Sequence, residues 1–232
     1  MEILYILLLF VLAAGFLVLL WFLLGKTGLF IFAPFGTILA NYQASGGVVD
    51  LWGLSFVPSA GMYVLLLSAL LFLVYKFGAR YGYFFIAVVL LTAVIDVVSD
   101  QVAAAMWEDS SDILNVIRVC GANIIATLAT GTVGIMLFEM FRKKELSFLL
   151  NAAISLTIMV AVDATIFPTI AFAGSAPFGD HMLTILNNWW HKLAFIALTL
   201  PIIWGMAKMA RAGIADQDEA PKVQRPSGRL NV

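Results

Sequence analysis

The feature that most restricts the fold of this chain is a series of seven long apolar segments separated by short polar loops. They cover residues 3–24, 28–43, 57–77, 82–104, 114–141, 147–173 and 182–209. A bilayer core needs roughly 20 mainly apolar residues per helix. The segments therefore predict an all-α, multi-pass transmembrane helical bundle with six or seven spans. Segment 28–43 leaves the count open, because it is short and contains Pro34 and Gly36, so it is either a half-helix or a tilted span.

Composition agrees with a membrane protein and excludes several other classes. Hydrophobic residues make up 62% of the chain and charged residues 12%, whereas an ordinary soluble domain has about 25% charged residues. The net charge of −1 and the lack of a basic, aromatic-rich patch argue against nucleic acid as a partner. Cys120 is the only cysteine and there are only two histidines, too few for a disulfide framework or a Cys/His metal site.

No phosphate-binding loop, hydrolase elbow or zinc-protease motif occurs in the sequence. We therefore expect a protein that is not an enzyme and that carries no cofactor and no metal. The expected partners are the lipid bilayer and a small-molecule substrate, and a homo-oligomer is an open alternative.

The basic residues of the loops all fall on one side of the predicted bundle. Basic residues occur in alternate loops: Lys26, then Lys76 with Arg80, then residues 142–144, and finally the Lys and Arg residues after 207. The loops around "GGVVDLWG", "MWEDSSDIL" and "GSAPFGDH" contain no Lys or Arg. Basic loops face the cytoplasm, which predicts an outside N-terminus and a cytoplasmic C-terminus in the cell (inner) membrane. Residues 1–212 form the predicted transmembrane domain, and the polar residues 213–232 a disordered cytoplasmic tail.

Five charged residues lie inside the predicted spans. They are Asp96, Asp100, Arg118, Asp163 and Lys192. Each costs on the order of 3 kcal/mol at a helix centre, so partners are expected. A rise of 1.5 Å per residue places all five in the middle or outer half of the membrane, with Asp163 and Lys192 both at a depth of roughly 15 Å. We expect Asp96 and Asp100, an i, i+4 pair, to pair with the cations or to carry a proton.

Uncharged polar residues occur at the same predicted depth. The stretch "NNWWHK" places Asn188 one turn from Lys192 and includes Trp189, and segment 28–43 delivers Asn41 and Gln43 to the outer face. These residues, with Arg118, Asp163 and Lys192, are the candidate substrate-binding set around an outward-facing cavity. Two alternatives stay open: Trp189 is either an interfacial residue or a flat wall for a planar ligand, and the charges could serve only to hold the helices together.

The stretch "GKTGLFIFAPFGTILANYQASGGVVDLWGL" resembles the queuosine-precursor transporters of the vitamin-uptake-transporter family. In that family the second helix ends in Ala-Asn-x-Gln after a Gly-Lys-x-Gly-Leu-Phe turn, which corresponds to Asn41 and Gln43. The stretches "NVIRVCGANIIA", "AVDATIFPTIAFAG" and "NNWWHKLAFIALTLP" are similar to its fifth, sixth and last helices. Through them the resemblance assigns Arg118, Asp163 and Lys192. Leu71, Tyr75 and Thr199 replace acidic residues of the family pattern, as expected of a divergent member.

The resemblance implies uptake of a 7-deazaguanine base, such as the cyano- or aminomethyl-substituted queuosine precursor. A planar base of this kind offers a face for Trp189, N–H groups for Asp163, and acceptor atoms for Arg118, Asn41 or Gln43. A similar small planar solute would find the same groups. Two other functions remain open: a substrate-capturing subunit of an ATP-driven vitamin transporter, and a membrane scaffold protein that transports nothing.

Overall fold

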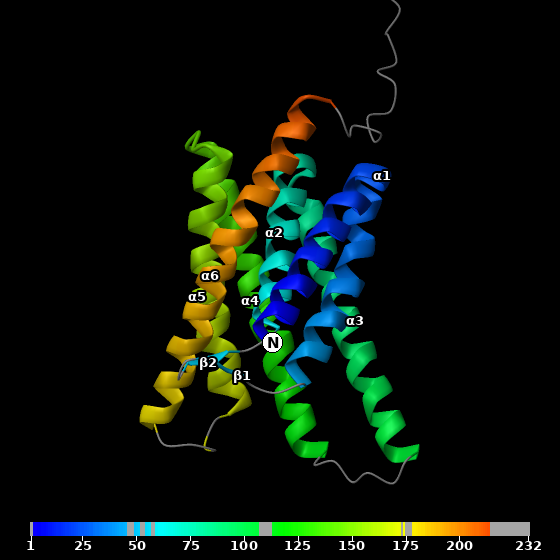
Figure 1. Cartoon of the computed structure of the whole chain (residues 1–232), viewed down its shortest axis with the longest axis vertical. Helices are drawn as coiled ribbons and strands as arrows, with labels where there is room; N and C mark the ends of the chain where they lie inside the picture. Colours follow the sequence, from blue (N-terminus) through cyan, green and yellow to red (C-terminus); the bar gives the residue numbers. More distant parts are fainter. Residues whose placement is uncertain are drawn as a thin grey trace, which may run out of the picture.

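The computed structural model of the chain describes residues 2–45, 49–51, 54–56, 59–106, 113–172, 174 and 178–213. This part is a bundle of long helices with one short antiparallel β-hairpin (Figure 1). The elements are α1 (Glu2–Ser45), β1 (Val49–Leu51), β2 (Leu54–Phe56), α2 (Ala60–Phe77), α3 (Ala79–Met106), α4 (Ile113–Lys143), α5 (Phe148–Ala171) and α6 (Phe178–Arg211). Six helices in the described residues are long and apolar enough to cross a membrane. The predicted all-α, multi-pass membrane bundle is confirmed.

Helix α1 is folded back on itself at Gly25, where φ is 55° and ψ is −129°. The two arms, residues 2–24 and 26–45, lie side by side (Figure 1), and each is about 30 Å long, enough to cross a bilayer. The return is so tight that a Cβ atom on Gly28 would lie 2.0 Å from the carbonyl oxygen of Leu20. The second arm stays helical through Pro34 to Ser45, so the half-helix alternative for residues 28–43 is wrong.

Helix α2 is the central element of the bundle. Of the residues in its apolar stretch, 78% are buried, against 22% of those in the apolar stretch of α3. Such burial is expected of a helix that is hydrophobic on all sides. Helices α1, α3, α4, α5 and α6 all contact it. The indole of Trp21 packs edge-on against the ring of Phe72, with 5.1 Å between the ring centroids. The first three residues of α2, Ala60, Gly61 and Met62, are already buried, so its first turn lies inside the bundle.

The residues before α2 form a β-hairpin that the sequence analysis did not predict. Val49 pairs with Phe56, Asp50 with Ser55 and Leu51 with Leu54, and β2 also contacts α6. We expected a loop here and a helix from residue 57. Strands of three residues are too short for an alternating pattern to identify, which explains both errors.

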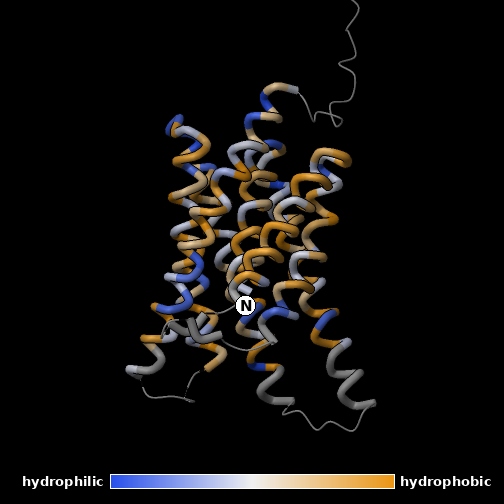
Figure 2. Tube along the Cα trace, viewed as in Figure 1, coloured by the Kyte–Doolittle hydropathy of each residue, from blue (hydrophilic) through white to orange (hydrophobic). Residues whose placement is uncertain are grey.

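The basic turns gather at one end of the bundle, uppermost in Figure 1. Figure 2 shows hydrophilic positions at this end and again in a band across the lower part of the bundle. The ammonium group of Lys26 lies 5.5 Å from the ring centroid of Phe77 and 4.8 Å from that of Tyr81. Arg211 Nε donates a hydrogen bond of 2.8 Å to Tyr75 Oη. These contacts join the turn of α1, the α2–α3 turn and the end of α6, so we call this end of the molecule the basic end.

Candidate functional site

The centre of the candidate site is an ion pair between two helices. Lys192 Nζ on α6 donates to a carboxylate oxygen of Asp163 on α5, and the two side chains are only 8% and 7% exposed. Asp163 lies eight residues before the end of α5 at Ala171, a distance of about 12 Å along the helix. Counting residues along the helices predicts the same depth for these two charges, and in the structure they form a direct ion pair.

Tyr63, in the first turn of α2, lies next to the Asp163–Lys192 pair. The ammonium group of Lys192 lies 4.7 Å from the centroid of the Tyr63 ring, a distance at which a cation is attracted to the face of the ring. The Tyr63 hydroxyl is buried and makes no hydrogen bond with any described residue, although it is close enough to Asp163 to interact with it electrostatically. Lys192 is therefore held between a carboxylate and an aromatic face.

Two threonine side chains of α4 lie next to this group. Thr127 and Thr130 both lie near the Tyr63 hydroxyl. Thr127 Oγ1 also donates a 3.3 Å hydrogen bond to Asn123 Oδ1, whereas the fully buried Thr130 Oγ1 makes no hydrogen bond within the described part of the chain. We name Asp163, Lys192, Tyr63, Thr127 and Thr130 the central polar cluster. Four helices, α2, α4, α5 and α6, contribute to it.

The sequence pattern did not predict Tyr63, Thr127 or Thr130 as site residues. Two glycines of α4 allow close helix packing: a Cβ atom on Gly131 would lie 2.5 Å from Ile86, and one on Gly134 would lie 2.3 Å from Met159. The sequence feature that could have identified Tyr63 is its phenol group in the otherwise apolar stretch "GMYVLLL".

The two tryptophans of "NNWWHK" occupy different environments. Trp190 is 59% exposed, which suits a residue that faces lipid or the interface. Trp189 is partly buried, and its indole Nε1 makes no hydrogen bond with any described residue. Its ring lines a hollow of about 530 Å³ against α5, with Thr157, Ala161 and Thr165 in the opposite wall. Asn188, half-buried, is one turn from Lys192, so Asn188 and Trp189 flank the central polar cluster on α6.

Asn41 and Asp96 form a separate polar contact between the second arm of α1 and α3. Asn41 Nδ2 donates a 2.7 Å hydrogen bond to Asp96 Oδ2. Gln43 is half-buried, and its Oε1 atom has no hydrogen-bond partner among the described residues. We expected Asp96 to pair with a cation or to carry a proton, and the partner observed is an amide.

Arg118 is not part of the central polar cluster. Arg118 is exposed on α4, and nine residues, or about 13 Å along the helix, separate it from Thr127. Asp100 is in α3, but its side chain lies outside the described residues, as does the predicted tail from residue 214 onward. The predicted single confluence of polar groups therefore divides into the Asp163–Lys192 pair, the Asn41–Asp96 contact and a distant Arg118.

The central polar cluster offers a ligand both kinds of hydrogen-bonding partner. Asp163 accepts, Lys192 donates, and the hydroxyls of Tyr63 and Thr130 do either. A ligand with adjacent donor and acceptor atoms could replace the contact between the two charged groups without leaving either group unpaired. Comparisons of the chain with protein-family models, curated proteins and solved structures found no match.

Proposed function

We propose that the chain is a membrane transporter that imports a small planar heterocycle of the 7-deazaguanine type. The observation that carries this proposal is the buried Asp163–Lys192 pair, about 12 Å from the nearer end of α5. Ionisable residues inside a membrane are expensive to insert and usually mark a substrate or ion pathway. The resemblance to queuosine-precursor transporters points to the same residues.

The chemistry of the cluster suits such a base. The carboxylate of Asp163 can accept hydrogen bonds from a ring N–H and an exocyclic amine, and Lys192 can donate to a ring carbonyl oxygen. The indole of Trp189, one turn from Lys192, supplies an aromatic face and an N–H donor that no described residue occupies. A bound base would thus separate Asp163 from Lys192 and give each a new partner.

The arrangement of charge supports import as the direction of transport. In the proposal the basic end faces the cytoplasm, because Lys and Arg in short loops are retained there, and the N-terminus lies outside. Asp163 is then about 12 Å from the outer end of α5 but about 22 Å from its cytoplasmic end at Phe148. A site closer to the outside is what an importer needs for capture.

Uptake into proteoliposomes tests the function without other transporters present. Purified protein is reconstituted, radiolabelled 7-cyano-7-deazaguanine or its aminomethyl analogue is added outside, and internal label is counted. We expect accumulation by the wild type and none by Asp163→Asn. Glu139→Gln is the matched control, since Glu139 also pairs with a basic residue, Arg142 at 2.6 Å, but at the basic end of α4. Folded wild-type protein that moves none of the deazapurines would overturn the proposal.

A binding measurement on the same purified protein separates the two rival functions. A capturing subunit would bind the base but need an added ATPase module for uptake. A scaffold would neither bind nor transport it. The scaffold has one observation in its favour, because neither of the two described hollows includes Asp163 or Lys192 in its walls. Ligand binding by the lone chain therefore decides against it.

A further inference from the structure

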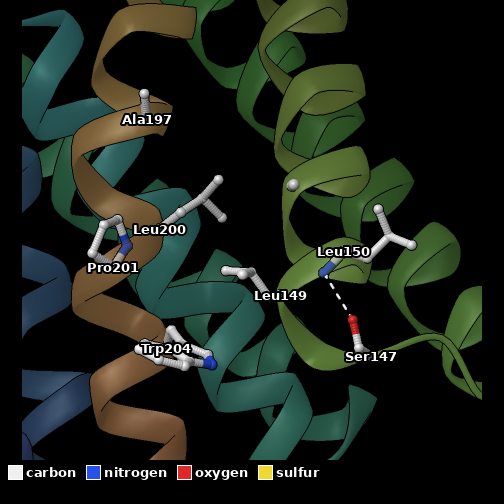
Figure 3. A pocket seen from close by; sticks show the side chains of 8 residues that line it. Ser147, Leu149, Leu150, Ala197, Leu200, Pro201 and Trp204 are labelled. Carbon is white, nitrogen blue, oxygen red and sulfur yellow. Dashed lines mark hydrogen bonds between the residues drawn. The ribbon is translucent and has the colours of Figure 1, made fainter.

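A second hollow lies between α5 and α6 toward the basic end (Figure 3). It measures about 590 Å³, and its walls are mainly apolar, formed by Leu149, Leu150 and Ala153 of α5 and by Leu200, Pro201 and Trp204 of α6. It opens to the outside of the bundle, since Leu150 is 48% exposed and Trp204 is 43% exposed. We name it the α5–α6 groove. In a membrane this surface meets lipid chains.

Positive charge surrounds the mouth of the α5–α6 groove. The ammonium group of Lys208 lies 3.6 Å from the ring centroid of Trp204, which itself lines the groove. On the α5 side, the exposed residues Lys143, at the end of α4, and Lys144, in the following turn, precede Ser147, another wall residue. Glu145 is the one acidic residue in that turn, so the lysines leave the mouth with a net positive charge.

The dimensions suit a lipid chain with its headgroup at the mouth. From Ala197 at the deep end to Trp204 at the mouth, the wall of α6 spans seven residues, or about 10 Å. Lys208 follows one turn later, at the level where a phosphate would lie. Tryptophan is favoured at this interface because its ring is apolar and its N–H is polar.

We propose that the α5–α6 groove binds an anionic phospholipid, with part of one acyl chain along Leu150, Leu200 and Trp204 and its phosphate near Lys208. Basic pockets between transmembrane helices on the cytoplasmic side recognise anionic headgroups in this way. The charge at the mouth favours an anionic lipid over a zwitterionic one with the same chains. This inference does not depend on the transport function.

Thermal unfolding of the detergent-purified full chain tests the site. The protein is titrated with phosphatidylglycerol and, separately, with phosphatidylcholine of identical acyl chains. We expect phosphatidylglycerol to stabilise the protein at a lower concentration. Lys208→Gln should reduce its apparent affinity on the order of fivefold, the effect of one basic residue near an anionic lipid surface. The affinity for phosphatidylcholine should not change.

Arg80→Gln is the matched control. Arg80 also stacks on an aromatic ring, that of Phe84 at 5.6 Å, but on α3, away from the α5–α6 groove. It should keep the wild-type preference. Equal affinity for both lipids in the wild type, or equal losses in Arg80→Gln and Lys208→Gln, would overturn the proposal, since either shows general surface charge only.

A further variant tests whether the apolar wall of the α5–α6 groove contributes to lipid binding. Ala153→Phe should fill the α5–α6 groove and weaken phosphatidylglycerol binding while leaving Lys208 in place. Free glycerol phosphate at the same concentrations should not raise the melting temperature. Stabilisation by glycerol phosphate equal to that by the lipid would mean that the α5–α6 groove contributes nothing, and would contradict a lipid site.

Discussion

Lys192 and Asp163 are 29 residues apart in the chain and form a buried ion pair between α6 and α5. Because the pair sits in an apolar bundle, either charge alone would be left without compensation. Removing one partner of a buried pair costs about 3–5 kcal/mol in soluble proteins, whereas replacing both by neutral groups is often harmless. This asymmetry allows the structural and functional roles of the pair to be separated.

We expect Asp163→Asn and Lys192→Met to lower the free energy of unfolding by about 3–5 kcal/mol each, and the double variant to recover most of that loss. Thermal unfolding in one detergent measures all three. The proposed function requires that the double variant, although folded, still fails to take up the base. A double variant as unstable as the single ones would mean that the pair does more than neutralise charge.

The Tyr63 hydroxyl can be tested separately from the Tyr63 ring. Tyr63→Phe keeps the ring 4.7 Å from Lys192 Nζ and removes a buried hydroxyl that lies near Asp163, Thr127 and Thr130, so the loss of stability should be about 1 kcal/mol or less. Uptake should weaken if the hydroxyl contacts the base. Tyr63→Leu also removes the cation–π contact, and we expect a loss of about 1–2 kcal/mol. Equal stabilities of the two variants would exclude that contact as a source of stability.

Because α1 is folded back on itself at Gly25, we expect alanine to have different effects on stability at Gly28 and at Gly15. A Cβ atom on Gly28 would lie 2.0 Å from the carbonyl oxygen of Leu20, whereas one on Gly15 would meet nothing within 4 Å. Gly28→Ala should therefore destabilise the protein by about 1–3 kcal/mol or more, the cost of overpacking. Gly15→Ala should be neutral or slightly stabilising. Similar melting temperatures for both variants would contradict the tight return at Gly25.

Labelling of single cysteines tests the orientation of the bundle. Cys120 is the only cysteine of the chain, so Cys120→Ser gives a cysteine-free background. Lys144 lies at the basic end and Gly179 near the opposite end of α6, and both are exposed. On intact cells an impermeant maleimide should label Gly179→Cys and not Lys144→Cys. The reverse pattern would mean that the basic end faces outward.

Asp96 provides a test of coupling. Carrying a proton is one of the two roles that the sequence predicts for Asp96, and Asn41 donates a hydrogen bond to its carboxylate. Asp96→Asn should still bind the base, but its uptake should no longer respond to an imposed pH gradient. Proteoliposomes with acidic and neutral outer buffers measure this response. A variant that responds as the wild type does would remove Asp96 from the coupling mechanism.

Hydropathy and charge predicted the parts of this fold that depend on the bilayer. The apolar runs identified the helices, and counting residues along them placed Asp163 and Lys192 at one depth, because a helix rises by a fixed 1.5 Å per residue. What counting could not predict is which helices are neighbours. The central position of α2, the role of Tyr63 and the separation of Arg118 from Asp163 all depend on helix packing, for which an apolar sequence gives little signal.

The central claim is that the Asp163–Lys192 pair is a binding site for a planar base. The most direct measurement is the melting temperature of the purified protein with a panel of deazaguanines, guanine and queuine, for the wild type and the neutral double variant. A ligand at 100 times its Kd stabilises the folded state by about 2.7 kcal/mol. We predict a shift with a deazaguanine in the wild type that the folded double variant lacks. No shift with any of these compounds, or a shift that persists in the double variant, would contradict the claim.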